Sequence, residues 1–165
     1  MYRIFRITWV IRYIVLCLFC LRIPTFLVAI GRPLVLIGFP RILFSDKVVV
    51  FPACRIEVFS GGQISIGNGV QIGQLCHITC AKNISIGDNV AIAGCAVITD
   101  ISHGTKPSSL PPLKREWSVK EVAIGDNCFI GWGAIILPGT QLGPGCTVGA
   151  NAKVSGIHEA GSIIV

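Results

Sequence analysis

Cysteine and histidine are the residue types in this chain best suited to metal binding, covalent chemistry or proton transfer. The sequence has eight cysteines and three histidines. Eight cysteines suggest disulfides or a zinc site, but the one close pair, Cys17 and Cys20, lies in an apolar segment with no second pair to complete such a site. We therefore expect reduced thiols, as in a cytosolic protein, and no metal.

His103 ends the segment Asp100-Ile101-Ser102-His103, directly before a stretch of unusual composition. Residues 104–121 contain three prolines, four basic residues and one tryptophan. This composition predicts one extruded loop, and loops of this length on a rigid scaffold often carry function. On residue type alone, however, a histidine at such a boundary is more typical of a solvent-exposed corner.

The element that must position these residues is a repeat of six. Aliphatic side chains recur at every sixth position, and small residues follow four places behind most of them. A period of six fits neither an α-helix nor the alternation of a single strand, so it indicates a solenoid with three short strands in each turn. The small positions account for half of the cysteines, which we expect to fill crowded corners. The clearest run is Ile124, Ile130, Ile136, Leu142, Val148 and Val154, and the corner cysteines are Cys54, Cys76, Cys128 and Cys146.

Residues 1–44 differ in composition from residues 45–165, which we predict to be the solenoid domain. Six arginines precede the first acidic residue, Asp46, whereas basic and acidic residues balance from there on, so the net charge of +6 belongs to the first segment. A neutral body does not favour nucleic-acid binding. No charge-free stretch approaches the roughly 20 residues that a membrane-spanning helix needs. We expect an apolar, arginine-bearing helix that contacts a membrane surface or packs on protein.

The hexads, the Asp100–His103 segment before the loop, and residues 129–151 together resemble the left-handed parallel β-helix acyltransferases. Within that group the chain is most similar to sugar O-acetyltransferases of surface-polysaccharide and O-antigen (lipopolysaccharide) biosynthesis. The resemblance implies an all-β fold, the left-handed parallel β-helix, with an N-terminal helical segment and one extruded loop. It also implies a homotrimer, acetyl-CoA as the acyl donor and a sugar or glycan as acceptor. The expected location is the cytoplasm, at the inner face of the cytoplasmic membrane.

The same resemblance assigns roles to individual residues. His103 would be the general base that takes a proton from a sugar hydroxyl, and Asp100 would orient its imidazole. His77 ends another hexad and is expected to face the acceptor or to serve the structure. The donor contacts implied by the motif fall on Gly131, Trp132 and Ala150, with Lys153 placed to meet a phosphate of CoA.

Two other functions fit parts of the sequence. A γ-carbonic-anhydrase-like metal site could use His77, His103 and His158, but the pair of histidines five residues apart that such sites contain is absent. A non-catalytic or degenerate β-helix scaffold of a membrane-associated complex is the other alternative. It is favoured by the end of the chain at Val165, before the tail with which similar acyltransferases cover CoA.

Overall fold

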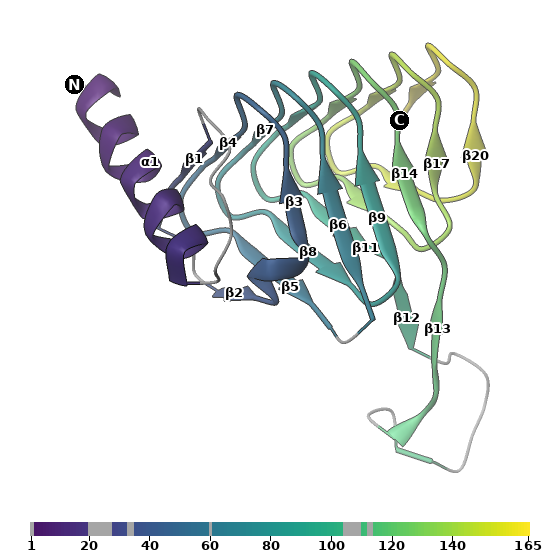
Figure 1. Ribbon diagram of the computed structural model, residues 1–165. Helices are drawn as coiled ribbons and strands as arrows, with labels where there is room; N and C mark the ends of the chain where they lie inside the picture. The colour runs from purple at the N-terminus through teal and green to yellow at the C-terminus, as the bar shows by residue number, and fades with distance from the viewer. Residues whose placement is uncertain (1, 20–27, 33–34, 60, 104–109, 112–113) are drawn as a thin grey trace.

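The computed structural model of the chain is a three-sided coil of parallel strands with one helix at its N-terminal end (Figure 1). It describes residues 2–19, 28–32, 35–59, 61–103, 110–111 and 114–165. The coil makes about six turns, and one hairpin projects from it. The predicted fold, a left-handed parallel β-helix, is confirmed.

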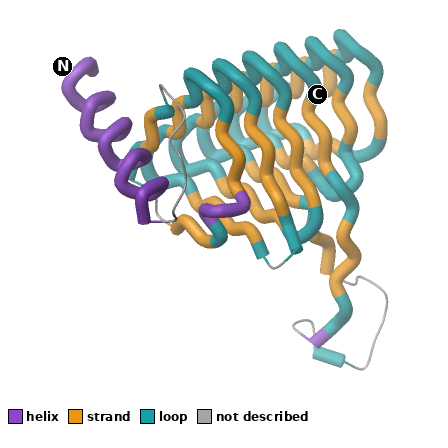
Figure 2. The backbone as a smooth tube through the Cα atoms, viewed as in Figure 1, coloured by secondary structure: helices purple, strands orange, loops and turns teal. Residues whose placement is uncertain are grey.

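Three parallel sheets, one for each side of the coil, contain all of the described strands except those of the hairpin. Strands of one sheet come from successive turns, so neighbours in space lie about one turn apart in sequence (Figure 2). Sheet A consists of β1 (Ala29–Ile30), β4 (Val49–Val50), β7 (Gln71–Ile72), β10 (Ala91–Ile92), β15 (Phe129–Ile130), β18 (Thr147–Val148) and β21 (Ile163–Ile164). Sheet B consists of β2 (Val35–Ile37), β5 (Arg55–Val58), β8 (His77–Cys80), β11 (Val97–Thr99), β16 (Ile135–Ile136) and β19 (Lys153–Val154). Sheet C consists of β3 (Ile42–Phe44), β6 (Gln63–Ile66), β9 (Asn83–Ile86), β14 (Val122–Ile124), β17 (Gln141–Leu142) and β20 (Ile157–His158).

The hexad aliphatic residues stack into columns inside the coil. Ile72 pairs with Ile92, and Ile92 pairs with Ile130, so one aliphatic residue per strand lies on the next. All three are buried. Burial of apolar surface contributes about 25 cal/mol of free energy per Å², and it is the main term that stabilises such a coil. The corner cysteines behave as predicted: Cys54, Cys76, Cys128 and Cys146 are buried free thiols, and each donates to a backbone carbonyl of the next turn.

The coil begins earlier in the chain than the predicted boundary at residue 44. Strands β1, β2 and β3, together with the short 3-10 helix Phe39–Arg41, form a complete first turn that pairs in register with the second. The signal was present in the sequence, because Ile30, Leu36 and Ile42 are spaced by six. It was hidden in a segment where nearly every residue is apolar.

The predicted N-terminal helix is present as α1 (Tyr2–Phe19) and lies across the first turn (Figure 1). Tyr13 and Cys17 are buried against the coil. The ring of Trp9 meets that of Phe51 edge to face at 5.8 Å, and Arg12 Nη1 donates to the carbonyl of Ile30 at 2.9 Å. None of the helices in the described part of the chain has the length and apolar character needed to span a membrane.

The predicted loop leaves the coil in its fourth turn, between sheets B and C. Its two ends pair as an antiparallel hairpin of β12 (Ile101–His103) and β13 (Trp117–Val119). Figure 1 shows this hairpin extending away from the coil. Residues 104–109 and 112–113, in the middle of the predicted loop, lie outside the described residues.

Candidate active site

His103 lies at the outer end of β12, where the hairpin leaves the coil. Its register partner across the hairpin is Trp117, and the two rings meet edge to face with centroids 5.3 Å apart. Trp117 in turn packs against Phe59 at 5.7 Å. The His103 side chain is exposed, and within the described residues neither of its ring nitrogens has a hydrogen-bond partner. The imidazole is therefore held by aromatic packing and is open to a ligand.

Asp100 does not make the expected contact with His103. Its fully buried carboxylate instead accepts hydrogen bonds from three successive backbone N–H groups of the preceding turn. Oδ1 accepts from Ala81 at 2.8 Å, and Oδ2 accepts from Lys82 at 2.7 Å and Asn83 at 3.0 Å. These donors lie where the coil is interrupted by the hairpin, so the Asp100 side chain supplies the acceptors for this corner.

The thiol of Cys80 completes the surroundings of the Asp100 carboxylate. Cys80 Sγ lies 3.4 Å from Asp100 Oδ2 and 3.2 Å from the carbonyl of Gln63. Burial and the negative charge of Asp100 raise the pKa of Cys80 to about 12. The thiol is therefore protonated at neutral pH and acts as a hydrogen-bond donor. Its role is structural rather than nucleophilic.

The predicted donor-binding residues Trp132 and Ala150 lie one above the other at the corner between sheets A and B. Trp132 precedes β16 and Ala150 precedes β19, and the N–H of Asn151 donates to the carbonyl of Trp132 at 2.8 Å. Among the described residues, the backbone N–H groups of Trp132 and Ala150 themselves have no partner. Two unpaired donors, spaced by one turn, can bind successive carbonyl groups of an extended ligand.

The Trp132 indole lies over Gly94 in the turn before it, because a Cβ on Gly94 would stand 2.5 Å from the ring. Gly131, also predicted to contact the donor, is buried and serves the packing of the coil. A Cβ at Gly131 would stand 2.7 Å from backbone atoms of the next turn, and its N–H donates to Val148. Lys153 lies in β19, opposite Ile135, with an exposed side chain. No salt bridge of Lys153 is found within the described chain.

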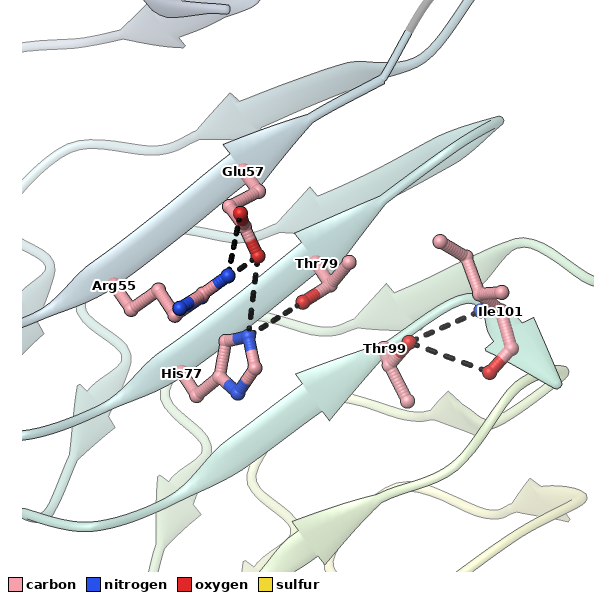
Figure 3. A network of polar contacts seen from close by, with 6 residues as sticks. All are labelled: Arg55, Glu57, His77, Thr79, Thr99 and Ile101. Carbon is pink, nitrogen blue, oxygen red and sulfur yellow. Dashed lines mark hydrogen bonds and ion pairs between the residues drawn. The ribbon is translucent and has the colours of Figure 1, made fainter. Parts of the chain in front are cut away.

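His77 belongs to a polar cluster on the outer face of sheet B (Figure 3). Glu57 accepts a forked pair of hydrogen bonds from Arg55 at 2.8 and 2.9 Å. His77 Nε2 lies 2.8 Å from Thr79 Oγ1 and 3.5 Å from Glu57 Oε2. The hydrogen bonds from Arg55 lower the pKa of the Glu57 carboxyl, even though burial opposes this shift.

Arg55 and Glu57 were not predicted as site residues. The sequence did contain a signal, because Arg55-Ile56-Glu57-Val58 places two opposite charges on one face of a strand whose other face is apolar. Phe59 follows on the same face and reaches Trp117. The polar cluster and His103 therefore lie along one continuous side of the molecule.

The histidines do not meet in a metal site. Across the described ranges, no group of three or more His, Cys, Asp or Glu side chains is arranged to hold an ion. His158 lies in β20, two turns beyond the hairpin, with its Nε2 3.1 Å from the carbonyl of Ser155.

Comparisons with known proteins find the same repeat and fold in acyltransferases. The family model for the hexapeptide repeat of succinyl-transferase matches residues 121–155. WbbJ of Escherichia coli (strain K12), named as a candidate lipopolysaccharide biosynthesis O-acetyl transferase, is 32% identical over 128 residues, which cover 73% of this chain and 65% of WbbJ. The aligned segment thus spans less than two thirds of that relative.

Solved structures show the same fold. AntD from Bacillus cereus, an N-acyltransferase in complex with dTDP and 3-hydroxybutyryl-CoA, superposes with a TM-score of 0.73 at 17% identity, over 85% of this chain and 76% of AntD. A maltose O-acetyltransferase from Clostridium difficile 630 gives a TM-score of 0.53 at 23% identity, over 81% of this chain and 63% of that one.

Proposed function

Because the chain is a hexapeptide-repeat β-helix that resembles sugar acyltransferases, we propose that it transfers an acetyl group from acetyl-CoA to a sugar hydroxyl. The reaction would belong to surface-polysaccharide or lipopolysaccharide biosynthesis, as the name of WbbJ suggests for that relative. The observation that carries the proposal is the exposed His103 imidazole beside Trp117, at the base of the hairpin. An open imidazole on a rigid coil suits proton transfer near neutral pH.

In this mechanism His103 accepts the proton of the acceptor hydroxyl as its oxygen attacks the thioester carbonyl. The carbon–sulfur bond then breaks, the acetyl ester is formed, and the CoA sulfur leaves and receives a proton from the imidazolium. Packing against Trp117 limits the orientations of the His103 ring. Asp100 contributes indirectly, because its hydrogen bonds to the turn at Ala81–Asn83 hold the junction from which β12 starts.

The acyl donor would lie along the corner between sheets A and B. The unpaired N–H groups of Trp132 and Ala150 are suited to the amide carbonyls of the pantetheine arm. Lys153, exposed on the next strand, is suited to a phosphate of CoA. AntD, which has this fold, is described with an acyl-CoA bound, and this supports the choice of donor.

Two partners complete the proposal. A homotrimer would place sheet faces of neighbouring coils opposite each other, and sedimentation at three times the chain mass would test it.

The outer face of α1 would rest on the anionic inner surface of the cytoplasmic membrane, since the first 45 residues have six arginines and no acidic residue. This face is exposed and apolar, comprising Ile7, Ile11, Ile14, Val15 and Leu18. Sedimentation with anionic but not zwitterionic vesicles, lost in Ile11→Asp, would support this contact.

The decisive experiment measures transfer of radiolabelled acetyl from acetyl-CoA to glycan acceptors. His103→Ala should abolish transfer and leave the assembly intact. His158→Ala is the matched control, because it removes a histidine two turns away and should leave transfer unchanged. Undiminished transfer by His103→Ala would refute the assignment. Absence of acetyl-CoA binding at millimolar concentration in a calorimetric titration would favour the non-catalytic scaffold instead.

A further inference from the structure

The polar cluster on sheet B favours one tautomer of neutral His77. The Glu57 carboxylate accepts both hydrogen bonds of the Arg55 fork, so it is ionised and can only accept. His77 Nε2 faces this carboxylate at 3.5 Å and Thr79 Oγ1 at 2.8 Å. A hydrogen on Nε2 is the tautomer of neutral His77 that satisfies both contacts, because the carboxylate can only accept and the Thr79 hydroxyl can accept as well; Nδ1 then carries the lone pair.

Nδ1 is the open side of the ring. Figure 3 shows one ring nitrogen of His77 turned toward Glu57 and Thr79 and the other turned away from them. No described residue forms a hydrogen bond to Nδ1, and the His77 side chain is 42% exposed. A hydrogen-bond acceptor of fixed direction is thus available to a ligand on this face.

The coil itself does not require the cluster. His77 pairs with Val97, which pairs with Ile135. Glu57 pairs with Ile37 on one side and with Thr79 on the other, and Thr79 pairs with Thr99. These positions form the same ladder without charge. The Glu57 side chain is only 8% exposed. Burial of a carboxylate carries a desolvation penalty that its partners must offset, so a cluster that only supported the sheet would be replaceable by apolar residues.

The cluster lies on the same side of the coil as the proposed catalytic histidine. On the face that carries Arg55 and Glu57, the next outward residue is Phe59, which contacts Trp117, which contacts His103. A sugar bound over these rings would present its apolar face to the aromatics and its hydroxyls to the polar groups beside them.

We propose that this face is the acceptor subsite, in which His77 Nδ1 accepts a hydrogen bond from a sugar hydroxyl and Glu57 is a positioning residue for the imidazole. The proposal rests on the proposed acetyl transfer for the nature of its ligand. It goes beyond the expected role of His77 by naming Nδ1 as the accepting atom and by adding Glu57 as the residue that positions the ring.

The first test needs no catalysis. In the full chain labelled with 15N-histidine, long-range 1H–15N spectra at a pH where His77 is neutral should show its hydrogen on Nε2. Glu57→Gln offers an amide donor to the ring, so it should increase the population with the hydrogen on Nδ1, whereas Lys82→Gln, on a salt bridge to Glu121 elsewhere, should not. Hydrogen on Nδ1 in the wild-type protein would overturn the proposal.

The second test compares two amide variants with methyl hexosides and UDP-sugars as acceptors. His77→Asn keeps an acceptor near the place of Nδ1, whereas His77→Gln moves its amide toward the place of Nε2. The Gln variant should raise KM for the acceptor about threefold to tenfold, as expected for one hydrogen bond, with kcat and KM for acetyl-CoA nearly unchanged. The Asn variant should recover most of the loss.

The outcomes separate this proposal from the one on which it rests. Equal acceptor KM in the wild type and both variants would overturn the subsite. If the wild-type protein acetylates no acceptor, the proposed function fails and the subsite with it. The spectra would then still decide whether Glu57 positions the His77 ring.

Discussion

Replacement of Asp100 tests most directly whether its carboxylate stabilises the corner of the coil from which the hairpin projects. Asp100→Ala removes three hydrogen bonds of 2.7–3.0 Å between an ionised carboxylate and backbone N–H groups. Hydrogen bonds to charged groups contribute about 1.5–3 kcal/mol each. Water can reach the partly buried turn and solvate some of the freed donors. We therefore expect the free energy of unfolding to fall by about 3–5 kcal/mol, at or below the lower end of the range that three such bonds span.

Asp100→Asn should destabilise the same corner by a smaller amount. The variant keeps the shape but turns one acceptor oxygen into an amide that faces a backbone N–H, so we expect about half of the loss. Asp126→Ala is the matched control. Asp126 is an exposed carboxylate that accepts a single backbone N–H, from Asp88 at 2.8 Å, and its loss should cost about 1 kcal/mol or less.

The assay combines thermal unfolding with hydrogen exchange. For a domain of this size, the Asp100→Ala loss corresponds to a melting temperature lower by about 10 °C. The amides of Ala81, Lys82 and Asn83 should exchange at least about tenfold faster than in the wild type, because their shared acceptor is gone. If Asp100→Asn unfolds like the wild type but has lost acetyl transfer, the structural role is refuted and the catalytic role is restored.

Other contacts support three further predictions. Gly94→Ala should displace the Trp132 indole, which lies 2.5 Å from the added Cβ, and so change tryptophan fluorescence and weaken CoA binding while the coil remains folded. The pKa of Glu57 is lowered in the folded protein, so its ion pair stabilises the fold above about pH 4.3, and this stabilisation is lost as the pH falls through the folded pKa. Glu57→Gln should therefore show a smaller drop in melting temperature on acidification than the wild type. An equal drop in both proteins would contradict this. Cys80, buried with a pKa raised to about 12, should resist alkylation at pH 8 until the protein unfolds, as mass spectrometry would show.

Most of the coil could be predicted because its repeat is a direct consequence of packing. One aliphatic residue per strand must point to the axis, and the strands are separated by corners of fixed length, so the period of six is visible wherever glycines and polar residues punctuate it. The first turn was missed because Ile30, Leu36 and Ile42 lie in a segment where apolar residues also fill the positions between them. There the period does not stand out.

The candidate site was only partly predictable, and strand geometry explains why. His103 could be located from its place before the loop. Asp100 could not be assigned correctly, because residues three apart in an extended chain point to opposite faces: Asp100 points into the coil and His103 points out. Arg55 and Glu57 come from a turn two before the hairpin, and only the register that pairs Arg55 with His77 brings them to the site.

The position of α1 across the first turn bears on polymerisation as well as on membranes. A parallel β-helix has an open strand edge at its end, and such an edge is a template on which a second copy can add its own turns. Here Arg12 Nη1 donates to the carbonyl of Ile30, which belongs to the outermost strand of sheet A. An incoming strand would need this acceptor, so we expect the helix to oppose fibre growth in the N-terminal direction.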